Sequence, residues 1–357
     1  MPAALVMFLL ASFPASSRPL AVWDQVHGAF LALFNPALGP TSGPPPAFKP
    51  VADHQPAFYR RAVEASIEVL VDDHLNGTGF LVSPGGYAMT AAHVVQTPGR
   101  RIEARTALGR VDAEVVALDL GHDLGLIKLK PATPQIWPTL ELADASPVVA
   151  TPVYLLGTPL YRHHVLFQGS IARDTPTYEY LPDEQRYVRI MHLSGMSPPG
   201  TSGGPWMLAS GAVVGVQSGL MHANGSYVGV AYMAPLDAIR ALVKRAEDAR
   251  TPSLGVAVEE LWEQPDQFLQ RFPKRTEGVM VSLVVPNGPA EGSGLRSEDL
   301  ITHVDGQRVI ERDELLGYIR SRAPGDTVDL LVVRPGESDH HIQIKLDWLE
   351  ARARPNP

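Results

Sequence analysis

Three segments of the sequence carry residues that could perform nucleophilic catalysis. His93 follows the small residues Thr90–Ala92, Asp123 lies between two apolar runs, and Ser202 sits in the glycine-rich block 199–205. A serine hydroxyl is a poor nucleophile until an imidazole accepts its proton, and a carboxylate on the other ring nitrogen fixes the tautomer and stabilises the imidazolium. The occurrence of His93, Asp123 and Ser202 in this order along the chain therefore predicts three roles. Ser202 is the nucleophile, His93 is the general base and then the acid, and Asp123 orients the histidine.

The glycines beside Ser202 have a mechanical role in this prediction. Their small size lets the backbone turn sharply and aim N–H groups at the carbonyl oxygen of a substrate. We expect the backbone N–H groups of Gly200 and Ser202 to form such an oxyanion hole. Loss of one donor of this kind typically slows acyl transfer about 10²–10³-fold.

Residues 200–204 also match the G-x-S-x-G elbow of α/β-hydrolases. That fold needs a strand, then the serine, then a helix, and its triad runs in the order Ser, Asp, His. In this chain residues 206–216 continue with β-like sequence, and a suitable histidine already lies upstream. The elbow is therefore set aside in favour of a serine that lies between strands.

The composition narrows the class of protein. The 357 residues include 31 glycines, 33 prolines and no cysteine, and the formal net charge is −8. The absence of cysteine excludes disulfide scaffolds, thiol nucleophiles and cysteine-ligated zinc. The acidic balance, without long single-sign blocks, argues against a nucleic-acid binder. The histidine pairs at 163–164 and 340–341 lack an HExxH motif or a carboxylate cluster, so we predict surface histidines, no metal and no cofactor.

Short apolar runs between Ala62 and Pro235 predict the elements that position the three segments. Glycine and proline separate these runs, and regular short strands at such spacing indicate a sandwich or barrel. One clear helix follows, because Leu236, Ile239 and Leu242 share a face with Val243. The predicted strands cover residues 67–71, 79–82, 87–90, 111–118, 124–129, 153–156, 165–171, 187–191, 212–217 and 227–231.

The amino terminus predicts export. Residues 1–17 carry no charge, and Ala3–Phe13 is nearly all apolar, which is too short to span a bilayer but long enough for a signal-peptide core. No Lys or Arg precedes this run, so an ordinary N-terminal strand or helix, or a misassigned start codon, stays an alternative. Residues 18–61 are predicted to form a proline-rich arm.

Together the three segments resemble the trypsin-like serine proteases, and specifically the HtrA (Deg) family. The family's Gly-x-Gly hairpin before the histidine corresponds to residues 77–93, and its aspartate with the following strand to 123–128. Its Pro-Gly-Asn-Ser-Gly-Gly-Pro block corresponds to 199–205, with Thr201 in place of the asparagine. The resemblance implies a mainly β chain, with a chymotrypsin-like double β-barrel protease domain over residues 62–249.

Residues 251–348 resemble a smaller α+β PDZ domain of the HtrA type, followed by a tail at 349–357. The resemblance rests on 289–295, expected as a short helix, on the Asp-Gly turn at 305–306 and on the Pro-Gly-Asp turn at 324–326. PDZ domains bind a peptide as an added strand and hold its carboxylate on loop N–H groups. Family position implies a peptide site at Leu254, Gly255, Val256 and Leu315. The apolar members of this set could equally be part of the domain core.

The loop before Ser202 departs from the family pattern, because Ser194–Pro198 lacks the usual Thr-Asp pair. This loop borders the specificity pocket and the oxyanion hole. No charged residue is evident among the expected pocket residues, which predicts an uncharged P1 residue in the substrate. Those pocket residues are Ser194, Gly195, Gln217, Ser218 and Gly219.

The resemblance implies a serine endopeptidase of protein quality control that cleaves misfolded or unfolded proteins. It also implies a homotrimer whose PDZ domain binds C-terminal peptides or regulates activity. With the predicted signal peptide and the composition, we expect a periplasmic or secreted protein with no nucleic-acid partner and no stable membrane span. Phe58 and Tyr59 could contribute to the trimer contact or belong to the core. The alternative is a chaperone or scaffold of the same architecture that is inactive at rest or not proteolytic at all.

Overall fold

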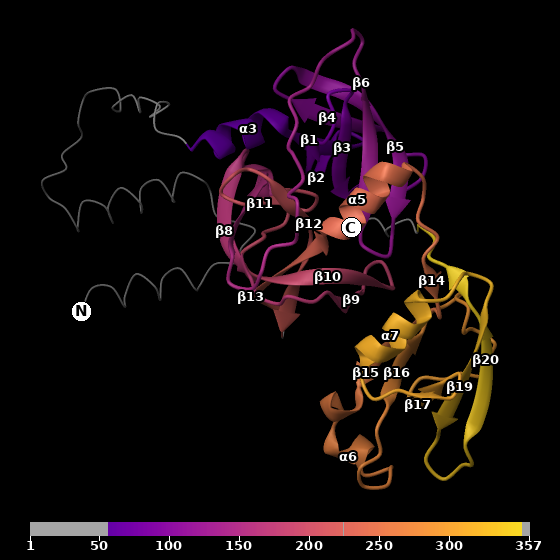
Figure 1. Cartoon of the computed structure of the whole chain (residues 1–357). Helices are drawn as coiled ribbons and strands as arrows, with labels where there is room; N and C mark the ends of the chain where they lie inside the picture. Colours follow the sequence, from indigo (N-terminus) through magenta and orange to yellow (C-terminus); the bar gives the residue numbers. More distant parts are fainter. Residues whose placement is uncertain (1–55, 224, 352–357) are drawn as a thin grey trace, which may run out of the picture. The chain divides into compact units, whose positions relative to one another are not determined.

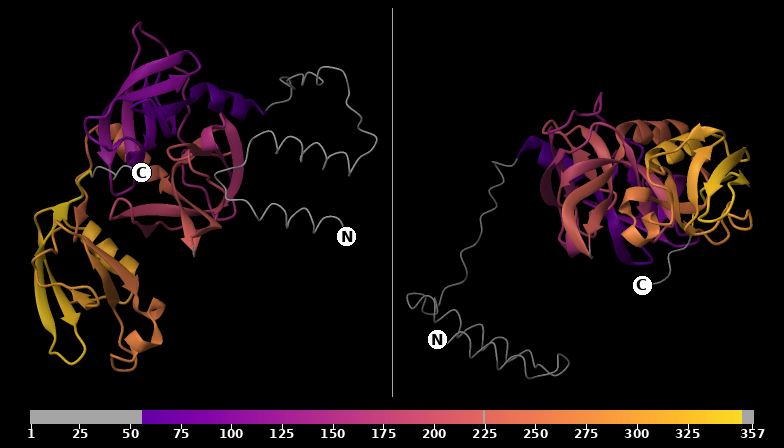
Figure 2. Two further views of the ribbon diagram at one scale, coloured as in Figure 1. Left: turned by 180° about the vertical axis from the view of Figure 1, so that it is seen from behind. Right: turned by 90° about the horizontal axis from the view of Figure 1, so that it is seen from below.

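The structure is a computed structural model that describes residues 56–223 and 225–351. The predicted signal peptide, most of the proline-rich arm and the end of the tail lie outside these residues. Strands dominate the described chain, first in two barrels and then in a smaller mixed domain, which confirms the predicted fold class (Figures 1 and 2). Among the described residues, no helix is long and apolar enough to cross a membrane.

Six strands close into the first barrel, in the order β1-β2-β3-β6-β5-β4, with β4 pairing to β1. Both faces of strand β6 carry buried apolar side chains: Leu126 packs between the barrels, whereas Ile127 and Leu129 fill the barrel interior. Helix α3 (Ala57–Ala65) leads into the barrel, and the short helix α4 (Ala92–Val95) follows β3. The strands are β1 (Ser66–Val71), β2 (His74–Leu81), β3 (Tyr87–Ala91), β4 (Ile102–Thr106), β5 (Gly109–Asp119) and β6 (Leu124–Lys130).

The second barrel is a seven-stranded sheet in the order β13-β12-β11-β7-β8-β10-β9. An additional pairing of β13 with β10 closes the ring and leaves β9 as an edge strand. Trp206 is fully buried in its core, and the indole Nε1 donates a hydrogen bond to Gln217 Oε1 at 2.8 Å. The strands are β7 (Pro152–Gly157), β8 (Val165–Ile171), β9 (Thr177–Leu181), β10 (Arg186–Gly195), β11 (Pro205–Met207), β12 (Val213–Ala223) and β13 (Ser226–Pro235), and the 3-10 turn η3 (Pro159–Tyr161) follows β7.

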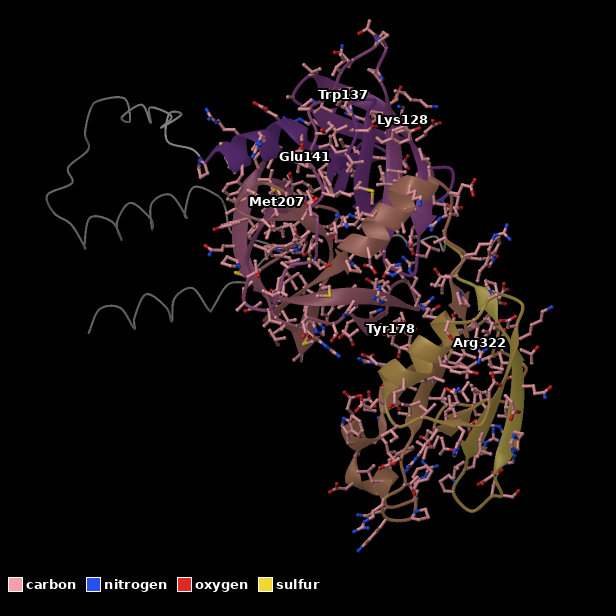
Figure 3. All side chains as sticks on the ribbon, viewed as in Figure 1. Lys128, Trp137, Glu141, Tyr178, Met207 and Arg322 are labelled. Atoms are coloured by element: carbon pink, nitrogen blue, oxygen red, sulfur yellow. The ribbon has the colours of Figure 1, made fainter. Side chains whose placement is uncertain are left out.

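An apolar cluster joins the two barrels. Phe80 and Leu126 from the first barrel pack with Met207 and Val216 from the second, and Met207 is labelled in Figure 3. Helix α5 (Leu236–Arg245) covers this cluster with its buried residues, as its spacing predicts, although Val243 at the edge of the face is 36% exposed. The site described below lies where these two barrels meet.

The smaller domain is a five-stranded path, β15-β16-β17-β19-β20, with β18 paired to β17 and a separate pair of β14 with β21. Helix α7 (Arg312–Arg320) packs against β14 and β15. The other elements are β14 (Pro252–Ser253), β15 (Val256–Glu260), η4 (Leu261–Glu263), α6 (Asp266–Leu269), β16 (Val279–Val284), β17 (Leu300–Val304), β18 (Gln307–Arg308), β19 (Thr327–Val333), β20 (His340–Lys345) and β21 (Asp347–Trp348).

The short helix expected at residues 289–295 is wrong, because this segment consists of turns. Gly292 and Gly294 adopt φ angles of 77° and 94°. Two left-handed residues so close together cannot continue a right-handed helix, which requires negative φ. The apolar residues Ala290 and Leu295 are nevertheless buried in the domain core.

Replacing Leu126 with alanine should destabilise the fold strongly. The side chain is 1% exposed in the cluster between the barrels, and its loss leaves a cavity there. We expect the free energy of unfolding to fall by about 2–5 kcal/mol. Urea denaturation would measure it, with Leu108→Ala as the control because Leu108 is 69% exposed. Equal losses for the two variants would contradict this account of the core.

Candidate active site

The carboxylate of Asp123 is the buried centre of the site. Its side chain has 0% exposure, and its Oδ2 accepts a hydrogen bond from His93 Nδ1 at 2.7 Å and another from the Ser218 hydroxyl at 2.6 Å. The backbone N–H of His93 donates to Oδ1 at 3.0 Å. His93 therefore binds the carboxylate through both its ring and its backbone, which fixes the orientation of the imidazole.

Local backbone geometry brings these two residues together. Asp123 adopts a left-handed conformation, with φ of 55°, in the turn between β5 and β6. Aspartate tolerates this region better than most side chains. The backbone carbonyl of Asp123 accepts a hydrogen bond from Ala92 at 3.0 Å, so the turn is attached directly to the start of α4. His93 is the next residue of that helix.

Asp123 is strongly acidic in this environment. Burial by itself raises the pKa of the carboxyl, but the charge and hydrogen bond of His93 lower it, with further lowering by Arg186 and Ser218. The balance sets the pKa of Asp123 to about 2, against an ordinary value of 3.8. The carboxylate is thus ionised at neutral pH, as an orienting group for a histidine base requires.

Ser202 lies in a loop that packs against the strands leading to His93. The backbone N–H of Thr78 on β2 donates to the carbonyl of Ser202 at 2.8 Å, and Gly203 donates to the carbonyl of Gln217 at 2.7 Å. Gly203 has a φ of 85°, and a Cβ there would come within 2.1 Å of the carbonyl of Thr78. Only glycine allows this approach, which places the serine loop beside the end of β3.

The hydroxyl of Ser202 is not hydrogen-bonded to His93 in the part of the chain that the structure describes. Catalytic hydrogen bonds in ligand-free sites are often long and tighten when a substrate binds. The contacts of Gly203 fix the position of the loop, and this position places Ser202 next to the segment that carries His93.

Gly200 supports the predicted oxyanion hole. Its φ is 98°, and a Cβ would lie 2.4 Å from the carbonyl of Thr158, so the position requires glycine. Thr201 donates its N–H to the carbonyl of Pro198 at 3.1 Å. Among residues 56–223 and 225–351, by contrast, the N–H groups of Gly200 and Ser202 have no hydrogen-bond acceptor. Both groups are thus available to a ligand oxygen.

Four of the five expected pocket residues divide into two groups, and the fifth, Gly219, lies on β12. Gln217 is 2% exposed and donates to the carbonyl of Gly219 at 2.7 Å, so its side chain is part of the internal packing. The hydroxyl of Ser218 supports Asp123, a contact that its sequence position did not suggest. Ser194 and Gly195 pair with β8, at Ser170 and Gly169, and end β10 beside the loop that leads to the serine.

Arg186 lies against the candidate site and was not predicted from the sequence. Its side chain is 2% exposed, and Nη2 lies 3.7 Å from Oδ1 of Asp123. No local motif marks it, because it opens a strand of the second barrel far from Asp123 along the chain. A charged residue at the start of a mostly apolar strand is the only signal that could have drawn attention to it.

Comparison with known proteins supports the resemblance. Residues 77–216 match the trypsin-like peptidase domain family, and residues 252–346 match the PDZ domain family. The chain is a trypsin-like peptidase domain followed by one PDZ domain, and its resemblance to the HtrA family is confirmed. Both matched ranges lie within the domains predicted from the sequence.

The relatives of this chain include proteins named probable periplasmic serine endoprotease DegP-like. One from Halomonas elongata is 30% identical over 284 residues, covering 77% of this chain and 57% of the relative. One from Chlamydia trachomatis is 28% identical over 272 residues, covering 74% and 53%. The chain therefore spans little more than half the length of these relatives.

Solved HtrA structures share the fold. The HtrA-type protease AlgW with a tripeptide has a TM-score of 0.56 at 22% identity, covering 84% of this chain and 97% of that one. The serine endoprotease from Yersinia pestis has a TM-score of 0.54 at 20% identity, covering 82% and 97%.

The expected peptide groove of the PDZ domain is filled by a side chain of the peptidase domain. Leu254, Val256 and Leu315 are buried, and Tyr187 belongs to the same apolar cluster. The Tyr187 hydroxyl donates to the carbonyl of Val258 at 2.7 Å and accepts from its N–H at 2.9 Å. Strand β15 has only β16 as a partner in its sheet, so Tyr187 satisfies backbone groups on the edge where an added peptide strand would pair.

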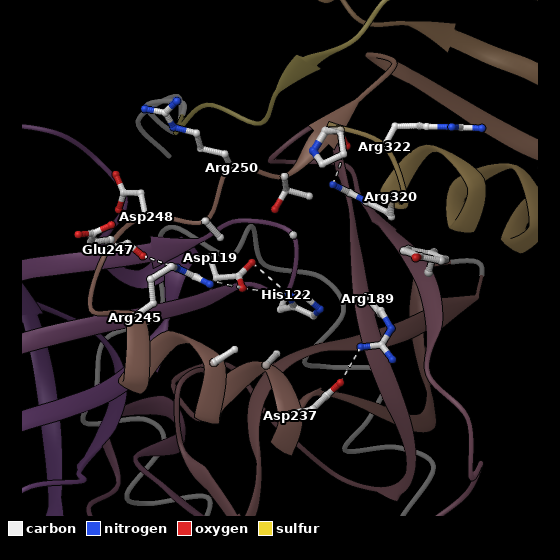
Figure 4. A pocket seen from close by; sticks show the side chains of 17 residues that line it. Asp119, His122, Arg189, Asp237, Arg245, Glu247, Asp248, Arg250, Arg320 and Arg322 are labelled. Atoms are coloured by element: carbon white, nitrogen blue, oxygen red, sulfur yellow. Dashed lines mark hydrogen bonds and ion pairs between the residues drawn. The ribbon is translucent and has the colours of Figure 1, made fainter. Parts of the chain in front are cut away.

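A separate cavity of about 720 Å³ lies between α5, β10 and the segment before the PDZ domain. Two pairs of its charged side chains contact each other: Arg189 with Asp237 at 3.2 Å, and His122 with Asp119 at 3.1 Å (Figure 4). His122 is therefore engaged away from Asp123. Across the described residues, no group of three or more His, Asp or Glu could hold a metal ion.

Acid should remove the stabilisation that ionised Asp123 contributes. Its folded-state pKa of about 2 lies below the unfolded value of 3.8, so the contribution is complete above the unfolded value and disappears as the pH falls through the folded one. We expect the difference in unfolding free energy between wild type and Asp123→Asn to shrink by about 1 kcal/mol from about pH 5 to about pH 3. Urea denaturation at both pH values measures this difference, and a constant difference would contradict the assignment.

Proposed function

We propose that this protein is a serine endopeptidase that cleaves misfolded or unfolded proteins through Ser202, His93 and Asp123. The observation that carries the proposal is the fully buried, ionised carboxylate that binds His93 at both its ring and its backbone, beside a glycine loop that presents a serine. The relatives named serine endoproteases support the reaction class. Unfolded substrates and the absence of a cofactor follow from the family resemblance.

The geometry supports a two-step hydrolysis. Ser202 Oγ attacks the scissile carbonyl carbon while His93 Nε2 takes the hydroxyl proton, and Asp123 stabilises the imidazolium. The carbonyl oxygen becomes an oxyanion held by the N–H groups of Gly200 and Ser202. Collapse breaks the C–N bond, and His93 gives its proton to the leaving amine. Water, deprotonated by His93, then attacks the acyl-enzyme and releases the carboxylic acid and the free serine.

The substrate pocket is proposed beside the end of β10, where Ser194 and Gly195 lie, with Gly219 on β12 as another wall. Their uncharged character supports an uncharged P1 residue in the substrate. The side chains of Gln217 and Ser218 point into the protein instead of lining the pocket. Gln217 accepts a hydrogen bond from Trp206, and Ser218 donates one to Asp123.

The chain is further proposed to act as a periplasmic or secreted homotrimer. The relatives are named periplasmic, which supports export. The trimer rests on the family resemblance alone. Of the two residues expected near a trimer contact, Tyr59 donates its hydroxyl to the carbonyl of His164 at 2.8 Å, and the Phe58 ring lies 5.1 Å from that of Tyr154. Both aromatic residues thus pack within their own chain.

Ser202→Ala should abolish both activity and active-site labelling. Without the hydroxyl no acyl-enzyme forms, so hydrolysis of unfolded casein should fall about 10⁴-fold or more. A fluorophosphonate probe should label the wild type and leave the variant unlabelled, with Ser210→Ala as a surface-serine control that labels normally. A wild type that neither labels nor degrades casein, with or without C-terminal peptides, would contradict the proposed function and favour the non-proteolytic scaffold.

The PDZ domain is proposed to bind C-terminal peptides in competition with Tyr187. A peptide that adds to β15 needs the N–H and C=O of Val258, which Tyr187 occupies. The loop amide of Gly255 donates to Ser253 Oγ at 3.0 Å and would have to exchange that partner for a carboxylate. The apparent affinity for a peptide therefore falls as the fraction of molecules with Tyr187 in the groove rises.

Tyr187→Ala should tighten peptide binding about tenfold or more, because it vacates the groove. Immobilised peptides with free carboxyl termini, compared with their amidated forms, would measure it. Tyr161→Ala is the matched control, since Tyr161 is 73% exposed and outside the groove. If the Tyr187 and Tyr161 variants retain the same peptides equally well, Tyr187 does not compete for the groove.

A further inference from the structure

Arg186 brings a positive charge to the back of the proposed catalytic site. The side chains of Arg186 and Asp123 are 2% and 0% exposed, and Nη2 lies 3.7 Å from Oδ1. That separation is longer than a hydrogen bond, and Oδ1 already has a closer donor in the backbone N–H of His93 at 3.0 Å. Arg186 therefore acts on Asp123 through its charge more than through a directed bond.

The residue after Arg186 anchors the backbone of β10 to the PDZ domain. Tyr187, the next residue of β10, inserts its ring among PDZ core residues and binds Val258. The carbonyl of Tyr187 accepts a hydrogen bond from Arg320 Nη2 at 2.8 Å. Because successive side chains on a strand point to opposite faces, this arrangement holds Arg186 towards Asp123.

The charges around Asp123 decide how strongly it can stabilise a protonated His93. Within the described residues, the charged groups that act on the carboxylate are His93 on α4 and Arg186 on β10, while Ser218 on β12 donates a neutral hydrogen bond. Behind Arg186 lies Arg320 on α7, whose pKa is lowered to about 10 by burial, with a contribution from the charge of Arg186. Arg186 and Arg320 are both arginines and stay charged over the physiological range.

We propose that Arg186 is a positioning residue whose buried charge offsets part of the negative charge of Asp123 and thereby limits the basicity of His93. The proposal rests on the proposed function, in which His93 must be neutral to accept the serine proton. A cation near the carboxylate opposes formation of the imidazolium, and in a water-excluded site the effect is not screened.

The test replaces Arg186 and follows the pH dependence of kcat/KM with an uncharged peptide substrate. Arg186→Met keeps much of the side-chain volume without the charge, and Arg186→Lys keeps the charge. Arg189→Met is the matched control, since Arg189 lies on the same strand but pairs with Asp237 at 3.2 Å. We expect the acid limb of the profile to move to higher pH by about one unit in Arg186→Met, and to stay in place in Arg186→Lys and Arg189→Met.

An unchanged acid limb in Arg186→Met overturns the proposal. So does an equal displacement in Arg186→Lys, because that result would assign the effect to packing. Thermal unfolding and fluorophosphonate labelling identify variants that have lost the fold, and Arg186→Gln then replaces the methionine variant.

A titration that needs no turnover separates this proposal from the proposed function. Histidine ring signals in the NMR spectrum of Ser202→Ala, with and without Arg186→Met, report the protonation of His93 directly. A displacement to higher pH in the double variant supports the charge effect even if the wild type shows no peptidase activity. No displacement contradicts the charge effect even if the wild type is an active peptidase.

Discussion

A carboxylate with no exposure to water must be compensated by the protein itself. Desolvation alone would raise the pKa of Asp123, so that its carboxyl would remain protonated to higher pH. A buried charge without compensation would also destabilise the fold severely. The compensation comes from both barrels: His93 from the first, Ser218 and Arg186 from the second. Ionised Asp123 therefore depends on the correct meeting of the two barrels, and the apolar cluster around Leu126 and Met207 maintains that meeting.

Strand β10 connects this centre to the PDZ domain. Its first residue, Arg186, faces Asp123, and its second, Tyr187, occupies the edge of the PDZ groove. The same strand ends at Gly195, where the loop towards the proposed nucleophile begins. One strand thus contacts Asp123, the expected peptide groove and the loop that leads to Ser202.

The barrel class and the residues proposed to react could be predicted because they leave local signals. A triad serine needs glycine neighbours, and the contacts of Gly200 and Gly203 show why: a Cβ at either would collide with a backbone carbonyl. The helix α5 follows from its apolar spacing. Residues 289–295 show the limit of such reasoning, since an apolar pattern with two glycines fits a helix or a set of turns equally well, and left-handed φ angles decided for turns.

The sequence by itself determined which side chains can react, in what order they occur and where glycine is required, because these properties belong to single residues and their immediate neighbours. It also determined that a PDZ domain follows. The tertiary structure alone decided that Ser218 and Arg186 face Asp123, and that Tyr187 fills a groove whose apolar residues could otherwise have been open to a peptide. Those contacts join residues far apart in the chain, and the register and packing of distant strands, which no local pattern encodes, set which of them meet.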